Sequence, residues 1–199
     1  MRKNRAAVFS WIMLWGIAIF PVFGQADPAF DWKALGENWK AYATDPSDEN
    51  ALEVYKTLPE KGFVSAAGEH GEAVAGDILK GFPVLERKII DKNRPAVRLG
   101  FRMFSIASGA LAVRLNLLLG NFIGFDPPMF LEELGLHRDL FPSLEPLLGS
   151  FRVDDTLDAD ARELERKYRI NILESVGAKS QKTLKDECVR ILKKIKISK

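Results

Sequence analysis

Signals for the start of a helix recur along this chain of 199 residues, and they constrain its fold more than any other feature. Asp27-Pro28, Asp45-Pro46 and Asp126-Pro127 each place a capping carboxylate before a proline, as at helix N-termini. Apolar residues follow at helical spacing, and no segment shows the sustained period-two alternation of a half-buried strand. The sequence therefore predicts an all-α fold.

We expect about eight short helices, separated by turns rich in glycine, proline and acidic residues. The segments expected to be helical are 28–42, 46–58, 69–80, 83–90, a long apolar segment 95–119, 126–135, 142–148, 158–176 and 180–197. The last two have the clearest amphipathic pattern. Their combined length suits a single all-helical domain over residues 25–199.

The first 24 residues carry the three parts of a secretory signal peptide. Arg2, Lys3 and Arg5 form a basic start, residues 6–23 carry no charge, and small residues follow. We expect cleavage after Gly24 or after Ala26. The alternative is an uncleaved anchor, because 18 apolar residues just reach the length of a membrane span. The expected location is the bacterial periplasm or the medium outside the cell.

Removal of this leader changes the charge of the chain. The whole sequence has 29 basic and 27 acidic residues, and all three basic residues before Gly24 leave with the leader. The remaining chain is then slightly acidic, which argues against a nucleic-acid partner. No Asn-x-Ser/Thr site is present, which favours a bacterial over a eukaryotic secreted protein.

Residues 96–125 are apolar enough to raise the question of a membrane hairpin. Arg114 separates two charge-free stretches of 11 residues each, and 11 residues are the length of a buried core helix. We therefore expect no stable membrane span once the leader is removed.

Residues that could carry catalysis or bind metal lack the partners that such chemistry needs. His70 and His137 stand alone without a second histidine at helical spacing, and Cys188 lies on an apolar stripe where a buried, inert thiol is expected. The acidic segment 154–165 resembles a calcium loop but has Ala159 where that loop requires glycine. We expect no metal, no cofactor and no enzymatic activity.

Three arginines form the one polar constellation that stands out. Arg94, Arg98 and Arg102 recur at a spacing of four, which places them on one ridge of a helix. This ridge could contact an anion or an acidic partner. The alternative, which we favour, is that the arginines pair with carboxylates of adjacent helices, Asp91 being the nearest in sequence. In that case we expect Arg98 to be structural and Arg94 to be exposed.

Residues 82–107 resemble the HEAT/armadillo class of helical repeats. Ile89-Ile90 ends one apolar stripe, Asp91-Lys92-Asn93 makes a turn, and Val97-Arg98 opens the next helix. Segment 186–190 is a fainter echo of this pattern. The resemblance implies short antiparallel helix pairs in a right-handed superhelix, although an irregular helical bundle fits the remaining sequence almost equally well.

These observations lead to an expected function of protein binding or scaffolding, by an exported module whose partner is another protein of the cell envelope or outside the cell. The alternative is a small-ligand carrier or enzyme with a pocket between helices. Such a pocket would lie near four aromatic residues, Phe101, Phe104, Phe122 and Phe125.

Overall fold

The computed structural model describes residues 30–151 and 159–197, and within these ranges the chain forms nine α-helices and three short 3₁₀ turns. The leader predicted over residues 1–24 and both cleavage sites lie outside the described residues. The helices are α1 (Trp32–Thr44), α2 (Asp48–Thr57), α3 (Glu69–Ile90), α4 (Arg94–Arg102), α5 (Gly109–Phe122), α6 (Pro127–Leu136), α7 (Glu145–Gly149), α8 (Ala159–Ser175) and α9 (Lys182–Lys194). The prediction of an all-α fold is confirmed.

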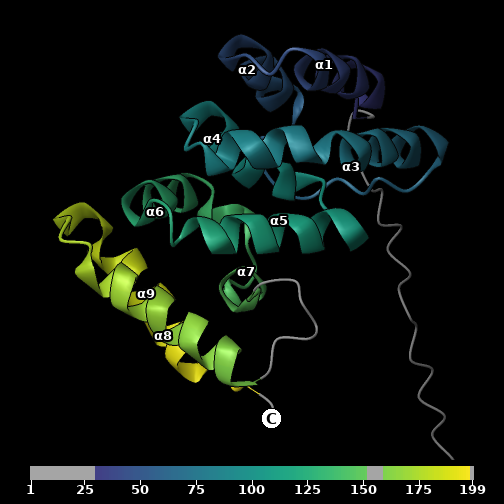
Figure 1. Cartoon of the computed structure of the whole chain (residues 1–199). Helices are drawn as coiled ribbons and strands as arrows, with labels where there is room; N and C mark the ends of the chain where they lie inside the picture. The colour runs from purple at the N-terminus through teal and green to yellow at the C-terminus, as the bar shows by residue number, and fades with distance from the viewer. Residues whose placement is uncertain (1–29, 152–158, 198–199) are drawn as a thin grey trace, which may run out of the picture.

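The helices stack as successive pairs along an elongated molecule (Figure 1). Helices α1 and α2 form one end, α3 with α4 and α5 with α6 form the next layers, and α8 with α9 forms the other end. Helix α3 contacts both α1 and α5, while α4 contacts both α2 and α6. Each pair therefore buries its apolar faces against the next one, and the two ends of the stack each have one face without a neighbouring pair.

Helix starts follow from side-chain caps. Asp31, Asn93 and Asp126 each accept a hydrogen bond from a backbone N–H three residues later, and so does Ser47. The prediction of a start at Asp126-Pro127 is correct. Helix α1 instead begins at Trp32 behind the cap Asp31, so the start expected at 27–28, which lies outside the described residues, does not belong to this helix.

Helix α3 corrects the expected boundaries. The segments 69–80 and 83–90 form one continuous helix of 22 residues with Pro83 inside it. Proline has no N–H to donate to the Leu79 carbonyl, but Nη1 of Arg114 approaches that oxygen at 3.5 Å. Two residues earlier, Nε1 of Trp39 donates to the Asp77 carbonyl (3.1 Å). The contact from Arg114 of α5 thus reaches the carbonyl that the proline leaves without a helical donor.

The apolar segment 95–119 is also divided differently from the prediction. Helix α4 ends at Arg102, a short turn follows, and α5 runs from Gly109 through Gly120 to Phe122. A Cβ atom at Gly120 would lie 2.6 Å from the Leu147 carbonyl oxygen, so this glycine permits close packing rather than breaking the helix. In the described ranges, no helix has both the length and the hydropathy needed to cross a membrane.

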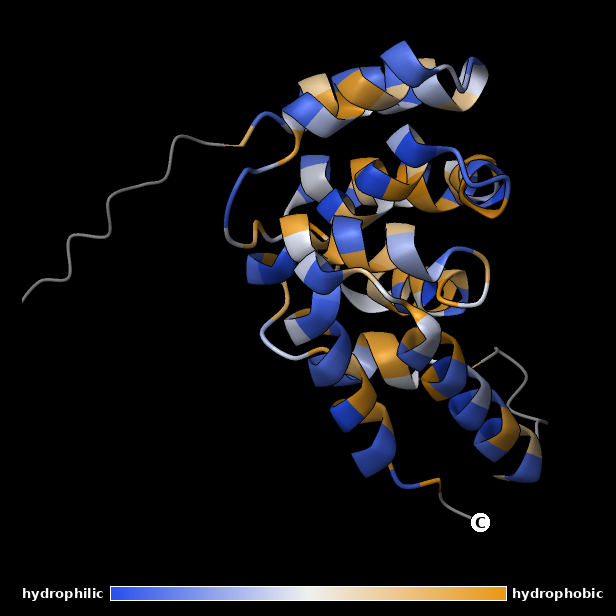
Figure 2. Ribbon diagram, turned by 90° about the vertical axis from the view of Figure 1, so that its left-hand side faces the viewer, coloured by the Kyte–Doolittle hydropathy of each residue, from blue (hydrophilic) through white to orange (hydrophobic). Residues whose placement is uncertain are grey.

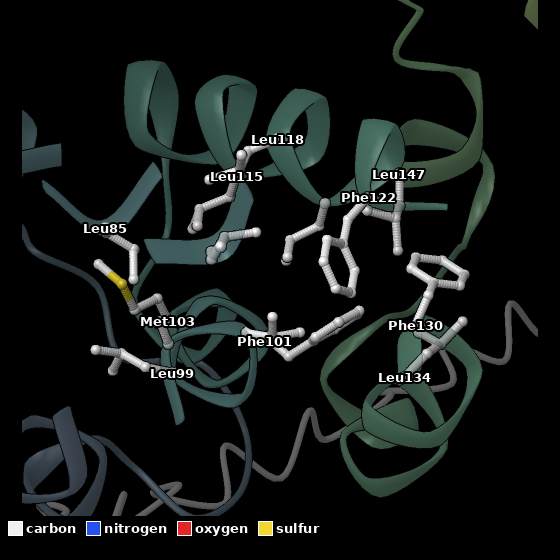
Figure 3. Packing of buried hydrophobic residues seen from close by; sticks show 14 of the residues in the cluster. Leu85, Leu99, Phe101, Met103, Leu115, Leu118, Phe122, Phe130, Leu134 and Leu147 are labelled. Atoms are coloured by element: carbon white, nitrogen blue, oxygen red, sulfur yellow. The ribbon is translucent and has the colours of Figure 1, made fainter. Parts of the chain in front are cut away.

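A continuous apolar core runs through the stack. Figure 3 shows Leu115 and Phe122 of α5 facing Phe101 of α4 and Phe130 of α6. All four side chains are fully buried. Hydrophilic residues lie on the outer sides of the helices, most visibly on the last pair (Figure 2). This rigid core fixes the relative positions of the polar side chains described next.

Candidate functional site

The arginine ridge on α4 faces α6, as its structural interpretation requires. Arg98 forms a forked pair with Glu133, in which Nε and Nη2 each donate to a different carboxylate oxygen at 3.0 Å. The Glu133 side chain is fully buried, while the Arg98 side chain remains 40% exposed. The hydrogen bond to Glu133 raises the pKa of Arg98. The partner is therefore Glu133, 35 residues away, and not the nearby Asp91.

Arg94 is exposed, as expected for the start of the ridge. Its Nη1 donates to Glu132 at 2.5 Å and lies 3.6 Å from the buried Glu133. Both side chains of the Arg94–Glu132 pair are close to half exposed. The hydrogen bond from Arg94 lowers the pKa of Glu132. Such a solvated pair contributes little to stability, about 0–1 kcal/mol.

Arg102 is directed away from the other two arginines and into the fold. It is 8% exposed, and its guanidinium donates to the backbone carbonyls of Glu60 (2.8 Å) and Leu58 (3.4 Å). The same group lies 5.1 Å from the centre of the Tyr55 ring. Arg102 therefore holds the segment that follows α2, and the three arginines do not converge on one ligand.

His137 joins this network at the C-terminal end of α6. Its Nδ1 lies 2.8 Å from the Glu133 carbonyl oxygen, which can only accept, so Nδ1 carries the proton. Its Nε2 is then free to accept from the Tyr55 hydroxyl at 3.2 Å. Burial lowers the pKa of His137, which favours the neutral ring. The structure thus places this residue at a helix terminus, as expected, but in an environment that opposes a positive charge.

A second buried arginine was missed by the sequence analysis. Arg169 of α8 is fully buried and donates to the carbonyl oxygens of Leu148 (3.0 Å) and Ser150 (3.0 Å). It also donates to Asn121 (2.8 Å) and Glu165 (2.9 Å). These acceptors come mostly from α5 and from the end of α7, so Arg169 fixes α8 against the stack. Its position one residue before the apolar Ile170 was the only available signal.

The four phenylalanines of the alternative pocket do not surround a common space. Phe101 packs on Phe130 and Phe141, and Phe104 packs on Phe141. Phe122 contacts Phe125, which is 43% exposed at the surface. Figure 3 shows the rings of Phe101 and Phe122 within the packed core. Phe101 and Phe122 are therefore part of the apolar core of the stack.

The candidates for metal binding and the lone cysteine lie apart in the described part of the chain. No cluster of three or more His, Cys, Asp or Glu side chains is found there that could hold a metal ion. The first five residues of the calcium-like segment, 154–158, lie outside the described residues. Of its described carboxylates, Glu163 pairs with Arg166 and Glu165 with Arg169. Cys188 is buried, as predicted, and burial raises the pKa of its thiol to about 12.

A groove lies between the two helices of the last pair. Its volume is about 480 Å³. All of its lining residues belong to α8 and α9, and they are Glu174, Lys185, Asp186, Val189, Arg190, Lys193 and Lys194. Asp186, Val189 and Arg190 stood out in the sequence only as part of the faint repeat pattern of segment 186–190, and that pattern did not indicate a groove. The signal that could have revealed them is the local charge, since residues 159–197 contain 11 basic and 6 acidic residues.

This positive charge contrasts with the other end of the stack. Residues 30–90, which include α1, α2 and α3, contain 11 acidic and 7 basic residues. The formal charge is therefore −4 over residues 30–90 and +5 over residues 159–197. The near-neutral charge of the whole chain hides this polarity along the stack.

Comparisons with known proteins place no relative beside this chain. No model of a protein family matches it, and searches of curated proteins and of solved structures return no significant match.

Proposed function

We propose that this chain is an exported, non-enzymatic helical module that binds another protein in the cell envelope or outside the cell. The signal-peptide pattern of residues 1–24 supports export. The resemblance of residues 82–107 to HEAT/armadillo repeats supports a binding role, because such stacks offer extended helical surfaces to partners. The proposal goes beyond the fold, since folds of this kind host many functions.

The observation that carries the proposal is the difference between engaged and available charge. In the middle of the molecule, Arg98 and Arg102 are occupied by groups of the same chain. In the terminal groove, no ion pair or side-chain hydrogen bond is found for Arg190 or Lys194 with any other described residue. Charges held at a groove without internal partners are suited to contact a second molecule.

Photo-crosslinking in the producing cell tests this function. A photoreactive amino acid would replace Arg190 in the groove in one variant and Lys33 at the opposite end of the stack in another. We expect a discrete adduct containing a second protein from at least one position. If neither position, nor further exposed positions on α3 and α5, crosslinks to a protein, the proposed function is wrong. Co-purification of one small molecule with the native protein would then favour the carrier alternative.

A further inference from the structure

We infer that the groove between α8 and α9 is the docking site for an acidic amphipathic helix of the partner protein. This inference rests on the proposed function and names the site and the partner class. The groove occupies the position in which a stack of helix pairs would receive its next helix. An amphipathic helix can take that position by helix-in-groove binding, with its apolar face against the floor of the groove.

The charges in the groove determine which sign of charge the partner must present to it. Two carboxylates line it, and each is already engaged with a lysine: Glu174 with Lys193 at 2.8 Å and Asp186 with Lys182 at 3.0 Å. Lys185 donates to the Val176 carbonyl at 2.7 Å. The cations left without a contact inside the described chain are therefore Arg190 and Lys194. The available charge of the groove is positive, and a complementary partner is acidic.

The spacing of these two cations also specifies geometry. Arg190 and Lys194 are four residues apart on α9, so they lie on one face, one turn from each other. A partner helix with two carboxylates at the same spacing can reach both. Val189 of α9 is the one apolar residue that lines the groove, and it is largely buried. A partner helix with one apolar stripe beside an acidic stripe can contact Val189 with the first and the two cations with the second.

A helix fits this site better than an anionic membrane surface does. The carboxylates of Glu174 and Asp186 stand at the rim and are about half exposed, at 49% and 56%. A flat anionic surface would meet these carboxylates together with the arginine and lysine. A helix lying in the groove can place its own carboxylates opposite Arg190 and Lys194 only.

Binding of a designed probe to the full mature protein tests this inference. The probe is a labelled helical peptide of about 16 residues, or four turns, with leucines on one stripe and glutamates at four-residue spacing on the next. A matched peptide carries glutamine in place of every glutamate. We expect the acidic peptide to bind at low salt at least about tenfold more tightly than the glutamine peptide, and to lose affinity as salt rises.

Two charge-reversal variants locate the binding site. The variant Arg190→Glu/Lys194→Glu reverses the charge of the two available cations in the groove. The control variant Lys40→Glu/Lys61→Glu makes the same change in net charge far from the groove. We expect the groove variant to lose at least about tenfold in affinity and the control less than about twofold. Circular dichroism and the unfolding midpoint should show that both variants remain folded. Equal losses in the two variants, or equal binding of the glutamine peptide, would overturn the inference.

Two other occupants give distinct results that would also overturn it. Binding to phosphatidylglycerol vesicles that is stronger than peptide binding, and is lost in the groove variant, would assign the groove to a membrane. Concentration-dependent dimerisation that is lost in the groove variant would assign it to the acidic end of a second copy. A cellular crosslink from the Lys33 position or from another exposed position outside the groove that persists in the groove variant would reject the docking site while leaving the proposed protein-binding function intact.

Discussion

The α4–α6 interface and the α8–α9 groove both carry basic side chains at helical spacing, Arg94 with Arg98 and Arg190 with Lys194, but they differ in what surrounds the charge. At α4–α6, the forked Arg98–Glu133 pair places a fully buried carboxylate opposite the guanidinium. In the groove, Arg190 is exposed and its neighbouring carboxylates are neutralised by lysines. The comparison shows that spacing alone does not distinguish structural from available arginines. What distinguishes them is whether groups of the same chain accept hydrogen bonds from the guanidinium: Arg98 and Arg102 have such acceptors, and Arg190 has none among the described residues.

The largest effect is expected from Arg169, the most completely buried of the structural arginines. Arg169→Leu removes a donor to four acceptors, two of which are carbonyls near the end of α7. Unsatisfied buried acceptors and an unpaired carboxylate should reduce the free energy of unfolding by about 3–5 kcal/mol. Urea denaturation measures this loss. A loss below about 1 kcal/mol would show that the network is not structural.

The next largest loss of stability is expected for Arg98→Ala. The free energy of unfolding should fall by about 2 kcal/mol, because the change leaves Glu133 buried without its forked partner. The exposed Arg94 provides the matched control, and Arg94→Ala should cost less than about 1 kcal/mol. A double-mutant cycle with Glu133→Gln isolates the pair, since removal of both charges should recover part of the loss. The assignment of Arg98 as structural is wrong if Arg94→Ala lowers the free energy of unfolding more than Arg98→Ala does.

His137 should give a smaller effect that appears only on acidification. Because burial lowers its pKa in the folded state, the unfolded state binds the proton first as the pH falls below 6.5. Tyr55, Glu133, Arg98 and Arg102 face the ring, and the two arginines oppose its protonation. One such group changes stability by at most about 1.4 kcal/mol per pH unit.

Urea denaturation at several pH values tests this linkage. His137→Asn keeps a donor near the position of Nδ1 but cannot titrate. We expect the unfolding free energy of the wild-type protein to decrease more steeply than that of the variant between about pH 7 and pH 5. Parallel slopes for the two proteins would contradict the linkage.

The smallest effect on stability is expected in the groove. Arg190→Gln/Lys194→Gln removes two exposed charges that no described residue neutralises, so the free energy of unfolding should change by less than about 0.5 kcal/mol. A loss comparable to that of Arg98→Ala would mean that these side chains are structural as well. The same denaturation measurement decides between these outcomes.

Local chemistry explains which parts of the fold could be predicted from the sequence. The turn 91–93 and the start at Asp126 were correct because their caps lie within three residues of the N–H groups that they accept from. The continuity of α3 through Pro83 could not be predicted. The contact that reaches the Leu79 carbonyl comes from Arg114 on another helix, 35 residues away.

The same distinction applies to the polar sites. The sequence predicted that Arg98 pairs with a carboxylate of an adjacent helix but could not identify Glu133, because that contact depends on how α4 and α6 pack. Arg169 was missed because its acceptors lie up to 48 residues away. The groove was missed because it exists only once α8 and α9 lie side by side.

The sharpest single test compares the affinity of the acidic helical peptide for Arg94→Gln and Arg190→Gln. Each variant removes one exposed arginine charge, from the α4 ridge in the first case and from the terminal groove in the second. We predict that Arg190→Gln weakens binding at least about threefold while Arg94→Gln leaves it within error, because Arg94 is already paired with Glu132. Weaker binding by Arg94→Gln, with unchanged binding by Arg190→Gln, would contradict the assignment of structural and available charge.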